Sequence, residues 1–98
     1  MMRQILKAQI FNYNEFINQD LSSDFYSGAL KKSGFNVISF QEHNFDPVGY
    51  TALWLLGESH FALHTFPEEN SYYIELSSCN ESFLIKFQKI INDKIGSK

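Results

Sequence analysis

Three strand-like segments follow one another closely in the middle of the chain. Residues 50–56, "YTALWLL", carry apolar side chains on both faces, which is typical of a central strand with both faces covered. Residues 60–66, "HFALHTF", form the next such run, and the loop "PEEN" separates it from residues 71–77, "SYYIELS". Because a loop this short joins two strands as a hairpin, the last two strands are predicted to run antiparallel. The chain is therefore restricted to folds built on an antiparallel sheet.

Two further strands are predicted before this region. Residues 3–12 carry apolar side chains among polar ones, and residues 35–43 alternate in the way a strand does. The segment "NFDPVG" then predicts a turn, because Pro47 and Gly49 interrupt regular structure.

Two helices are predicted from apolar residues at three- and four-residue steps. The first is predicted to start at Asn14, which can cap it, and to end at Gly34. The second is predicted over residues 80–93. Two caps compete for its start, a capping box that begins at Ser78 and the side chain of Asn80.

The resulting order of elements, β-α-β-β-β-α, defines an α+β fold. A two-layer sandwich, with an antiparallel sheet covered on one face by both helices, is the natural way to bury their apolar surfaces. The 98 residues amount to one domain, so residues 1–98 are predicted to fold as a unit. A chain of this size is only marginally stable alone, which makes oligomerisation an expectation.

Composition excludes several classes of partner. The formal net charge is −3, and the longest basic cluster is the pair Lys31–Lys32, so a nucleic-acid partner is not expected. No apolar run approaches the about 18 residues of a membrane span, and the first residues do not resemble a signal peptide. The single cysteine, Cys79, fits a reducing compartment, which predicts a cytoplasmic protein.

Residues 57–69, "GESHFALHTFPEE", concentrate side chains that carry chemistry. In a strand, residues two apart share a face, so His60 and His64 lie on the same side. The hairpin brings Cys79 back beside the start of this segment. We therefore expect Ser59, His64 and Cys79 to converge near one sheet edge, provided that the register does not slip.

Three chemistries fit these residue types. A Ser or Cys nucleophile with a His base would form a hydrolase-like site, although the chain lacks a G-x-S-x-G elbow. Zinc could be held by His60, His64, Cys79 and His43, although no C-x-x-C is present. The third chemistry is self-processing, in which the Ser59 hydroxyl attacks the preceding carbonyl. Taken singly, each residue has an ordinary structural role, and only their combination favours a functional site.

One long stretch resembles a known family. The segment "HNFDPVGYTALWLLGESHFALHTFPEENSYYIELSSC", residues 43–79, is similar to the prokaryotic S-adenosylmethionine decarboxylase family. The family pattern is H-x-F-x-P-x-G, an apolar strand, E-S-H-x(3)-H-T-W-P-E and a strand that ends in Cys. The core motif, with a cysteine twenty residues after its serine, carries the resemblance.

The resemblance implies a proenzyme that cleaves itself. The Ser59 hydroxyl would attack the Glu58 carbonyl, and His64 would help to remove the Ser59 α-proton. The chain would then split between these two residues into fragments 1–58 and 59–98.

The resemblance also implies a cofactor, a reaction and a partner. Ser59 would become a pyruvoyl group, which forms a Schiff base with the substrate amine and accepts electrons as carbon dioxide leaves. Cys79 would return the proton. The substrate would be S-adenosylmethionine, the product would be the aminopropyl donor for spermidine synthesis, and the assembly would be a homodimer. No metal is implied.

Four further residues match family positions that bind substrate or assist processing. Phe45 would stack on the adenine, and Glu68 would accept hydrogen bonds from the ribose hydroxyls. Thr51 stands where the family has a serine that assists processing, and Phe61 would contact the nucleoside through its backbone. Core packing for Phe45 and a solvated loop for Glu68 are the competing explanations.

Several positions depart from the family pattern. Phe66 replaces a tryptophan, and Gly57 replaces a serine or alanine before Glu58. Glu75 and Asn80 replace an aspartate and a glycine. The chain is also expected to be a shortened member without the last strand. Two alternatives follow, namely an arginine or ornithine decarboxylase on the same scaffold, and an unprocessed homologue that acts as a binding partner.

Overall fold

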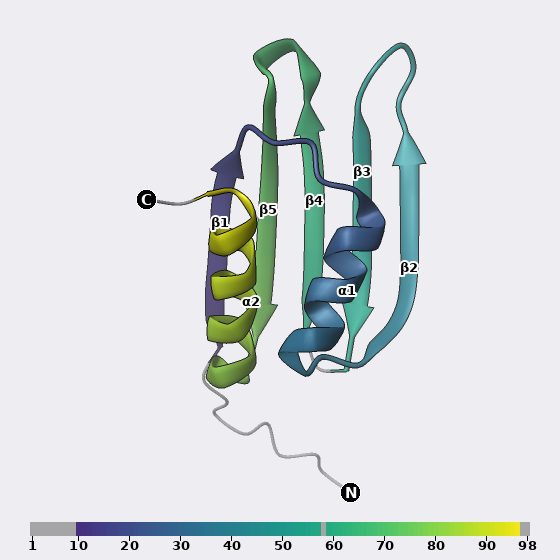
Figure 1. The fold of residues 1–98 in the computed structure, drawn as a ribbon. Helices are drawn as coiled ribbons and strands as arrows, with labels where there is room; N and C mark the ends of the chain where they lie inside the picture. The colour runs from purple at the N-terminus through teal and green to yellow at the C-terminus, as the bar shows by residue number, and fades with distance from the viewer. Residues whose placement is uncertain (1–9, 58, 97–98) are drawn as a thin grey trace, which may run out of the picture.

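The computed structural model describes residues 10–57 and 59–96, and within them the predicted α+β two-layer architecture is confirmed. The antiparallel sheet has the strand order β1-β5-β4-β3-β2. Both helices lie on the same face of this sheet, with α2 over β1 and β5 and α1 over β3 and β4 (Figure 1). The elements in chain order are β1 (Phe11–Ile17), α1 (Ser23–Ser33), β2 (Val37–Asn44), β3 (Tyr50–Leu56), β4 (His60–Phe66), the 3₁₀ turn η1 (Pro67–Glu69), β5 (Ser71–Ser78) and α2 (Glu81–Lys94).

Aromatic side chains form the centre of the core between the helices and the sheet. Trp54 on β3 and Phe61 on β4 are fully buried and lie 5.1 Å apart between ring centroids. Tyr26 from α1 and Phe87 from α2 each pack on Phe61. The Trp54 Nε1–H donates a hydrogen bond of 2.9 Å to the Ser27 hydroxyl, which fixes α1 on the sheet. Neither described helix is long and apolar enough to cross a membrane.

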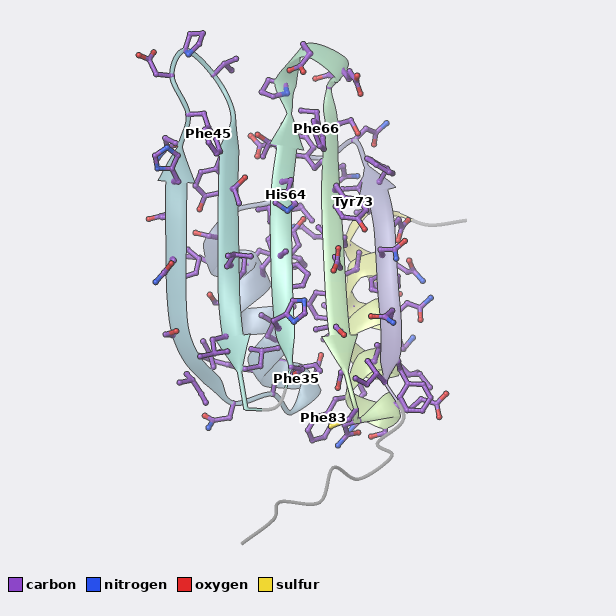
Figure 2. All side chains as sticks on the ribbon, turned by 180° about the vertical axis from the view of Figure 1, so that it is seen from behind. Phe35, Phe45, His64, Phe66, Tyr73 and Phe83 are labelled. Atoms are coloured by element: carbon purple, nitrogen blue, oxygen red, sulfur yellow. The ribbon has the colours of Figure 1, made fainter. Side chains whose placement is uncertain are left out.

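The other face of the sheet has no covering layer in the described chain. Leu53 and Leu55 on β3 point to this face and are 46% and 52% exposed, and Phe16 on β1 is 66% exposed. The expectation that β3 is covered on both faces is therefore wrong for the single chain, because both helices pack on one side. We call this uncovered surface the open face (Figure 2).

The first helix begins later than the sequence predicts. Residues 14–17 belong to β1, and Asn14 pairs with Glu75 on β5 instead of capping a helix. Buried and exposed side chains alternate along residues 13–17 as they do in a strand, because Tyr13 and Ile17 face the core while Asn14 faces outward. This alternation explains why these residues form a strand and not the start of the helix. Ser22 is the actual cap of α1, and the remaining part of the strand predicted over 3–12 lies outside the described residues.

Particular residues determine where α1 ends and where α2 begins. Gly34 ends α1 as predicted, with a φ of 113° that favours glycine. At the start of α2 the Asn80 side chain accepts a hydrogen bond from the Phe83 N–H, so Asn80 is the cap. The Ser78 hydroxyl instead accepts from the Asn80 N–H, and the capping box is not formed. The strand predicted over 35–43 begins two residues later, at Val37.

Replacement of Ser22 tests where α1 begins. The Ser22 Oγ accepts a hydrogen bond of 3.1 Å from the Phe25 N–H, so Ser22→Ala is expected to lower the free energy of unfolding by about 1 kcal/mol. The matched change Asn14→Ala is expected to have a much smaller effect, because Asn14 caps nothing. Urea unfolding of both variants measures the difference, and a larger loss for Asn14→Ala would contradict this assignment.

Candidate functional site

Ser59 and Cys79 border one pocket of about 430 Å³ at an end of the sheet. The pocket lies where β3 turns into β4 and where β5 ends, because His60 pairs with Ser77 in the register of those strands. The Leu56 N–H donates a hydrogen bond of 2.9 Å to the Ser59 carbonyl and closes the turn. The expectation that the hairpin returns Cys79 to the neighbourhood of Ser59 is thus confirmed. Glu58, the predicted residue before the cleaved bond, lies outside the described residues.

The pocket is formed by backbone, small polar groups and two aromatic rings. None of the described residues that line it carries a carboxylate or a basic group. Phe35 and Phe83 supply the aromatic part, with ring centroids 5.3 Å apart and planes at 76° (Figure 2). The lining residues are Gly34, Phe35, Asn36, Gly57, Ser59, Ser78, Cys79, Asn80 and Phe83.

His64 does not lie beside Ser59 within one chain. It is five residues further on, a separation of about 16 Å along an extended strand. There it pairs with Thr51 on β3, whose Oγ1 is 3.1 Å from the His64 Nδ1, and with Tyr73 on β5, whose ring is nearly parallel to the imidazole. The predicted convergence therefore holds for Ser59 and Cys79 but not for His64 in the same chain.

The predicted nucleoside-binding residues lie at the same distant end of the sheet. Phe45 is 50% exposed in the loop between β2 and β3, where its ring packs edge-on against His43. It is therefore accessible and not a core residue. Glu68 is exposed in η1, at the end of β4. Figure 2 shows Phe45 and Phe66 together at this end, opposite Phe35 and Phe83.

Phe61 differs from the other predicted site residues because its side chain is in the core. The ring is fully buried and packs against Tyr26, Trp54 and Phe87. A ligand could meet only its backbone, which is the role that the family resemblance implies.

The residues thus separate into two groups within one chain. We call the group of Ser59 and Cys79 the reactive end, and the group of Phe45, Thr51, His64 and Glu68 the His64 end. The reactive end offers a hydroxyl and a thiol. The His64 end offers a potential base, which Thr51 orients, together with an exposed aromatic ring and a carboxylate.

Two of the arrangements considered from sequence are not formed among the described residues of one chain, namely a metal site and a pair of Ser59 with His64. Among residues 10–57 and 59–96, no group of three or more His, Cys, Asp or Glu side chains is placed to hold a metal ion. A hydrolase-like pair of Ser59 with a His64 base is not formed inside one chain, because the two residues belong to different ends of the sheet.

Sequence reasoning did not assign Phe35, Phe83 or Tyr73 to the site. Phe83 lies in α2 and borders the pocket. Its position four residues after Cys79, in the first turn of α2, is the signal that could have indicated this. Tyr73 follows from alternation, since it stands opposite His64 in the predicted hairpin.

Fold and site together define a class of protein. It is a small two-layer α+β domain that presents a serine and a cysteine in one pocket at the end of an antiparallel sheet. The chain belongs to the S-adenosylmethionine decarboxylase family, because the model of that family, described as S-adenosylmethionine decarboxylase, matches residues 5–98.

Individual relatives agree with this assignment. The chain is 32% identical over 79 residues to an S-adenosylmethionine decarboxylase proenzyme of Thermodesulfovibrio yellowstonii, covering 79% of this chain and 58% of the relative. It is 45% identical over 51 residues to the S-adenosylmethionine decarboxylase proenzyme 2 of Bacillus anthracis, covering 52% of this chain and 42% of the relative. The chain therefore spans about half the length of the curated relatives it matches.

A solved structure shows the same fold. The adenosylmethionine decarboxylase of Aquifex aeolicus superposes with a TM-score of 0.64 at 26% sequence identity. The superposition covers 76% of this chain and 62% of that one.

Tyr50 anchors the loop that carries Phe45. Its Oη–H donates a hydrogen bond of 2.5 Å to the Glu42 carboxylate, and its N–H donates one of 2.9 Å to the Thr65 Oγ1. Burial, together with the hydrogen bond to Glu42, raises the pKa of Tyr50 to about 12.

The substitution Glu42→Gln is expected to lower the pKa of Tyr50 toward its ordinary value of 10.0, because the carboxylate no longer disfavours the phenolate. The raised pKa means that stability is lost as the pH rises from about 10 to about 12, and the variant should lose less in this window. Absorbance titration of the tyrosines measures the pKa. The matched change Glu69→Gln, in η1, should leave the titration unchanged, and an identical curve for both variants would contradict the assignment.

Proposed function

We propose that this chain is the proenzyme of a pyruvoyl-dependent decarboxylase that acts on S-adenosylmethionine. The observation that carries the proposal is the pairing of Ser59 and Cys79 in one pocket of a chain that belongs to this family. The family's relatives are described as proenzymes, which fits a reactive serine at a strand turn. The product would be the aminopropyl donor for spermidine synthesis. A reducing cytoplasm would keep the Cys79 thiol from oxidation, as its use as a proton donor requires.

Self-processing would start at Ser59. Its hydroxyl would attack the Glu58 carbonyl, the peptide bond would become an ester, and removal of the Ser59 α-proton would eliminate the Glu58 carboxylate and split the chain. The dehydroalanine left at position 59 would then add water and release ammonia, which leaves the pyruvoyl carbonyl. A Cβ built on Gly57 would meet nothing within 4 Å, so the glycine before Glu58 is not required by close packing. His64, held by Thr51, would take the α-proton.

The residues of the reactive end fit a pyruvoyl group at position 59. Residue 59 borders a pocket wide enough for a small molecule, and Cys79 borders the same pocket. When present, the group supplies a carbonyl that draws electrons from the substrate's α-carbon as carbon dioxide leaves. Cys79 would then donate a proton from its Sγ to that carbon. Phe45 would stack on the adenine and Glu68 would accept hydrogen bonds from the ribose, both at the His64 end.

A complete site requires two chains. Ser59 and His64 lie about 16 Å apart along the strand in one chain, so His64 cannot remove the Ser59 α-proton there. A homodimer with the open faces together, related by a two-fold axis that lies between the sheets and runs perpendicular to the strands, would place the reactive end of one chain against the His64 end of the other. The exposed Leu53, Leu55 and Phe16 side chains give this face the apolar surface that such a contact needs.

Intact mass tests self-processing and the separate roles of two residues. Wild-type protein should yield fragments 1–58 and 59–98, and Ser59→Ala should stay whole because the attacking hydroxyl is gone. Cys79→Ala should split but release carbon dioxide from S-adenosylmethionine at least about 100-fold more slowly. An unbroken wild-type chain would indicate the non-catalytic alternative. Faster turnover of arginine or ornithine would indicate the other decarboxylases.

Mixing two inactive variants tests the shared site. Ser59→Ala and His64→Ala should each remain uncleaved when produced alone. When the two are co-expressed in equal amounts, about half of the His64→Ala chains should split, because a random mixture pairs half of them with a chain that supplies His64. Mass spectrometry identifies the cleaved variant by its substituted fragment. A site completed within one chain predicts no cleavage in the mixture.

A further inference from the structure

Four side chains lie in one row across the strands of the open face. Thr51 on β3 pairs with His64 on β4, and His64 pairs in turn with Tyr73 on β5. Tyr73 then pairs with Phe16 on β1. Directly paired residues of neighbouring strands point to the same face of a sheet, so their side chains interact along the row. We call these four residues the His64 row.

The two neighbours of His64 restrict its ring in different ways. The Thr51 Oγ1 lies 3.1 Å from the His64 Nδ1, which fixes one atom of the imidazole but allows the ring to tilt about that contact. The Tyr73 ring lies at 25° to the imidazole plane, with ring centroids 6.3 Å apart, and limits this tilt (Figure 2). Because Thr51 engages Nδ1, Nε2 is the nitrogen left to take a proton.

Tyr73 is itself held in place by two contacts. Its ring packs on Phe16, with centroids 4.9 Å apart, and its Oη–H donates a hydrogen bond of 3.1 Å to one carboxylate oxygen of Glu75. The other oxygen of Glu75 lies 3.8 Å from the His60 Nε2. Since both the ring and the hydroxyl of Tyr73 are fixed, the tyrosine offers His64 a surface of defined orientation.

We propose that Tyr73, held by Phe16 and Glu75, is a positioning residue that keeps the His64 imidazole in the orientation needed for chain splitting. The role rests on the proposed function, in which His64 removes the Ser59 α-proton of the other chain. Tyr73 touches none of the reacting atoms and acts through His64 alone. It therefore assists the elimination and not the formation of the ester, because only the elimination uses His64 as a base.

Trapping the ester tests this role. Tyr73→Leu should slow chain splitting about 10- to 100-fold, because a small misplacement of a catalytic group has a large effect on rate. The ester should accumulate in this variant, and hydroxylamine should cut it to release a fragment 59–98 that starts with serine instead of the pyruvoyl group. Intact mass distinguishes the two fragments. Tyr73→Phe keeps the ring and should split at close to the wild-type rate.

Co-expression of two variants shows on which chain Tyr73 acts. In the mixture of Ser59→Ala with His64→Ala, the Ser59→Ala chain supplies His64. Adding Tyr73→Leu to that chain should slow the splitting of its partner about 10- to 100-fold. Adding Tyr73→Leu to the His64→Ala chain should leave the splitting unchanged, since that chain brings no His64 to the site that is cut. Both mixtures contain the same substitutions, so a loss of folding or of dimerisation would affect them alike.

A matched control comes from the edge strand β2. Phe40→Leu removes an aromatic ring that is 38% exposed and packs on Trp54, away from the His64 row. This variant should split as the wild type does, and circular dichroism checks that each variant is folded.

Three results would overturn the role of Tyr73. Splitting of Tyr73→Leu at the wild-type rate would show that His64 keeps its orientation without the ring. Slow splitting without accumulated ester, or equal slowing in the two mixtures, would show a merely structural role. Failure of the proposed function has a different signature, because the wild-type chain would then neither split nor release a fragment with hydroxylamine.

Discussion

The register of β4 between its two neighbours decides what this molecule can do. His60 pairs with Ser77 and His64 pairs with Tyr73, so the motif that begins at Ser59 is stretched along the sheet and not folded into a cluster. Backbone hydrogen bonds on both sides of β4 hold this spacing. A shift by one residue would turn every side chain of the strand to the other face and remove Phe61 from the core. The same register that builds the core therefore separates the reactive end from the His64 end.

Within the described residues, both helices pack on one face of the sheet. This arrangement buries Trp54 and Phe61 and leaves Leu53 and Leu55 exposed on the open face. Apolar residues on an open face and a site divided between the two ends of the sheet are the two observations that motivate the proposed dimer, in which a second copy is placed face to face.

Much of the fold could be predicted because local rules and tertiary packing agree. The strands β3 and β4 have the bounds that their apolar pattern and short connections indicate, and Gly34 ends α1 as a glycine with positive φ should. The prediction failed at residues 14–17, where helical spacing of apolar residues was accidental. Pairing with β5 overrides that spacing, and a single sequence does not reveal which partner a first strand will find.

The candidate site could also be predicted only in part. The proximity of Ser59 and Cys79 follows from hairpin geometry, which depends on neighbouring residues only. The position of His64 could not be decided from the same pattern, because the motif places it close in sequence while an extended backbone places it far away in space. Phe35 was missed because its contact with Phe83 joins segments that are distant in the chain.

Gly34 connects the stability of the fold with the shape of the pocket. It ends α1 in a backbone conformation that other residues rarely adopt, and the space above its α-carbon is filled by the Phe83 ring. Any side chain at this position would strain the turn and push the ring at the same time. A lineage that changes Gly34 must therefore accommodate a different end of α1 and a differently shaped pocket at the same time.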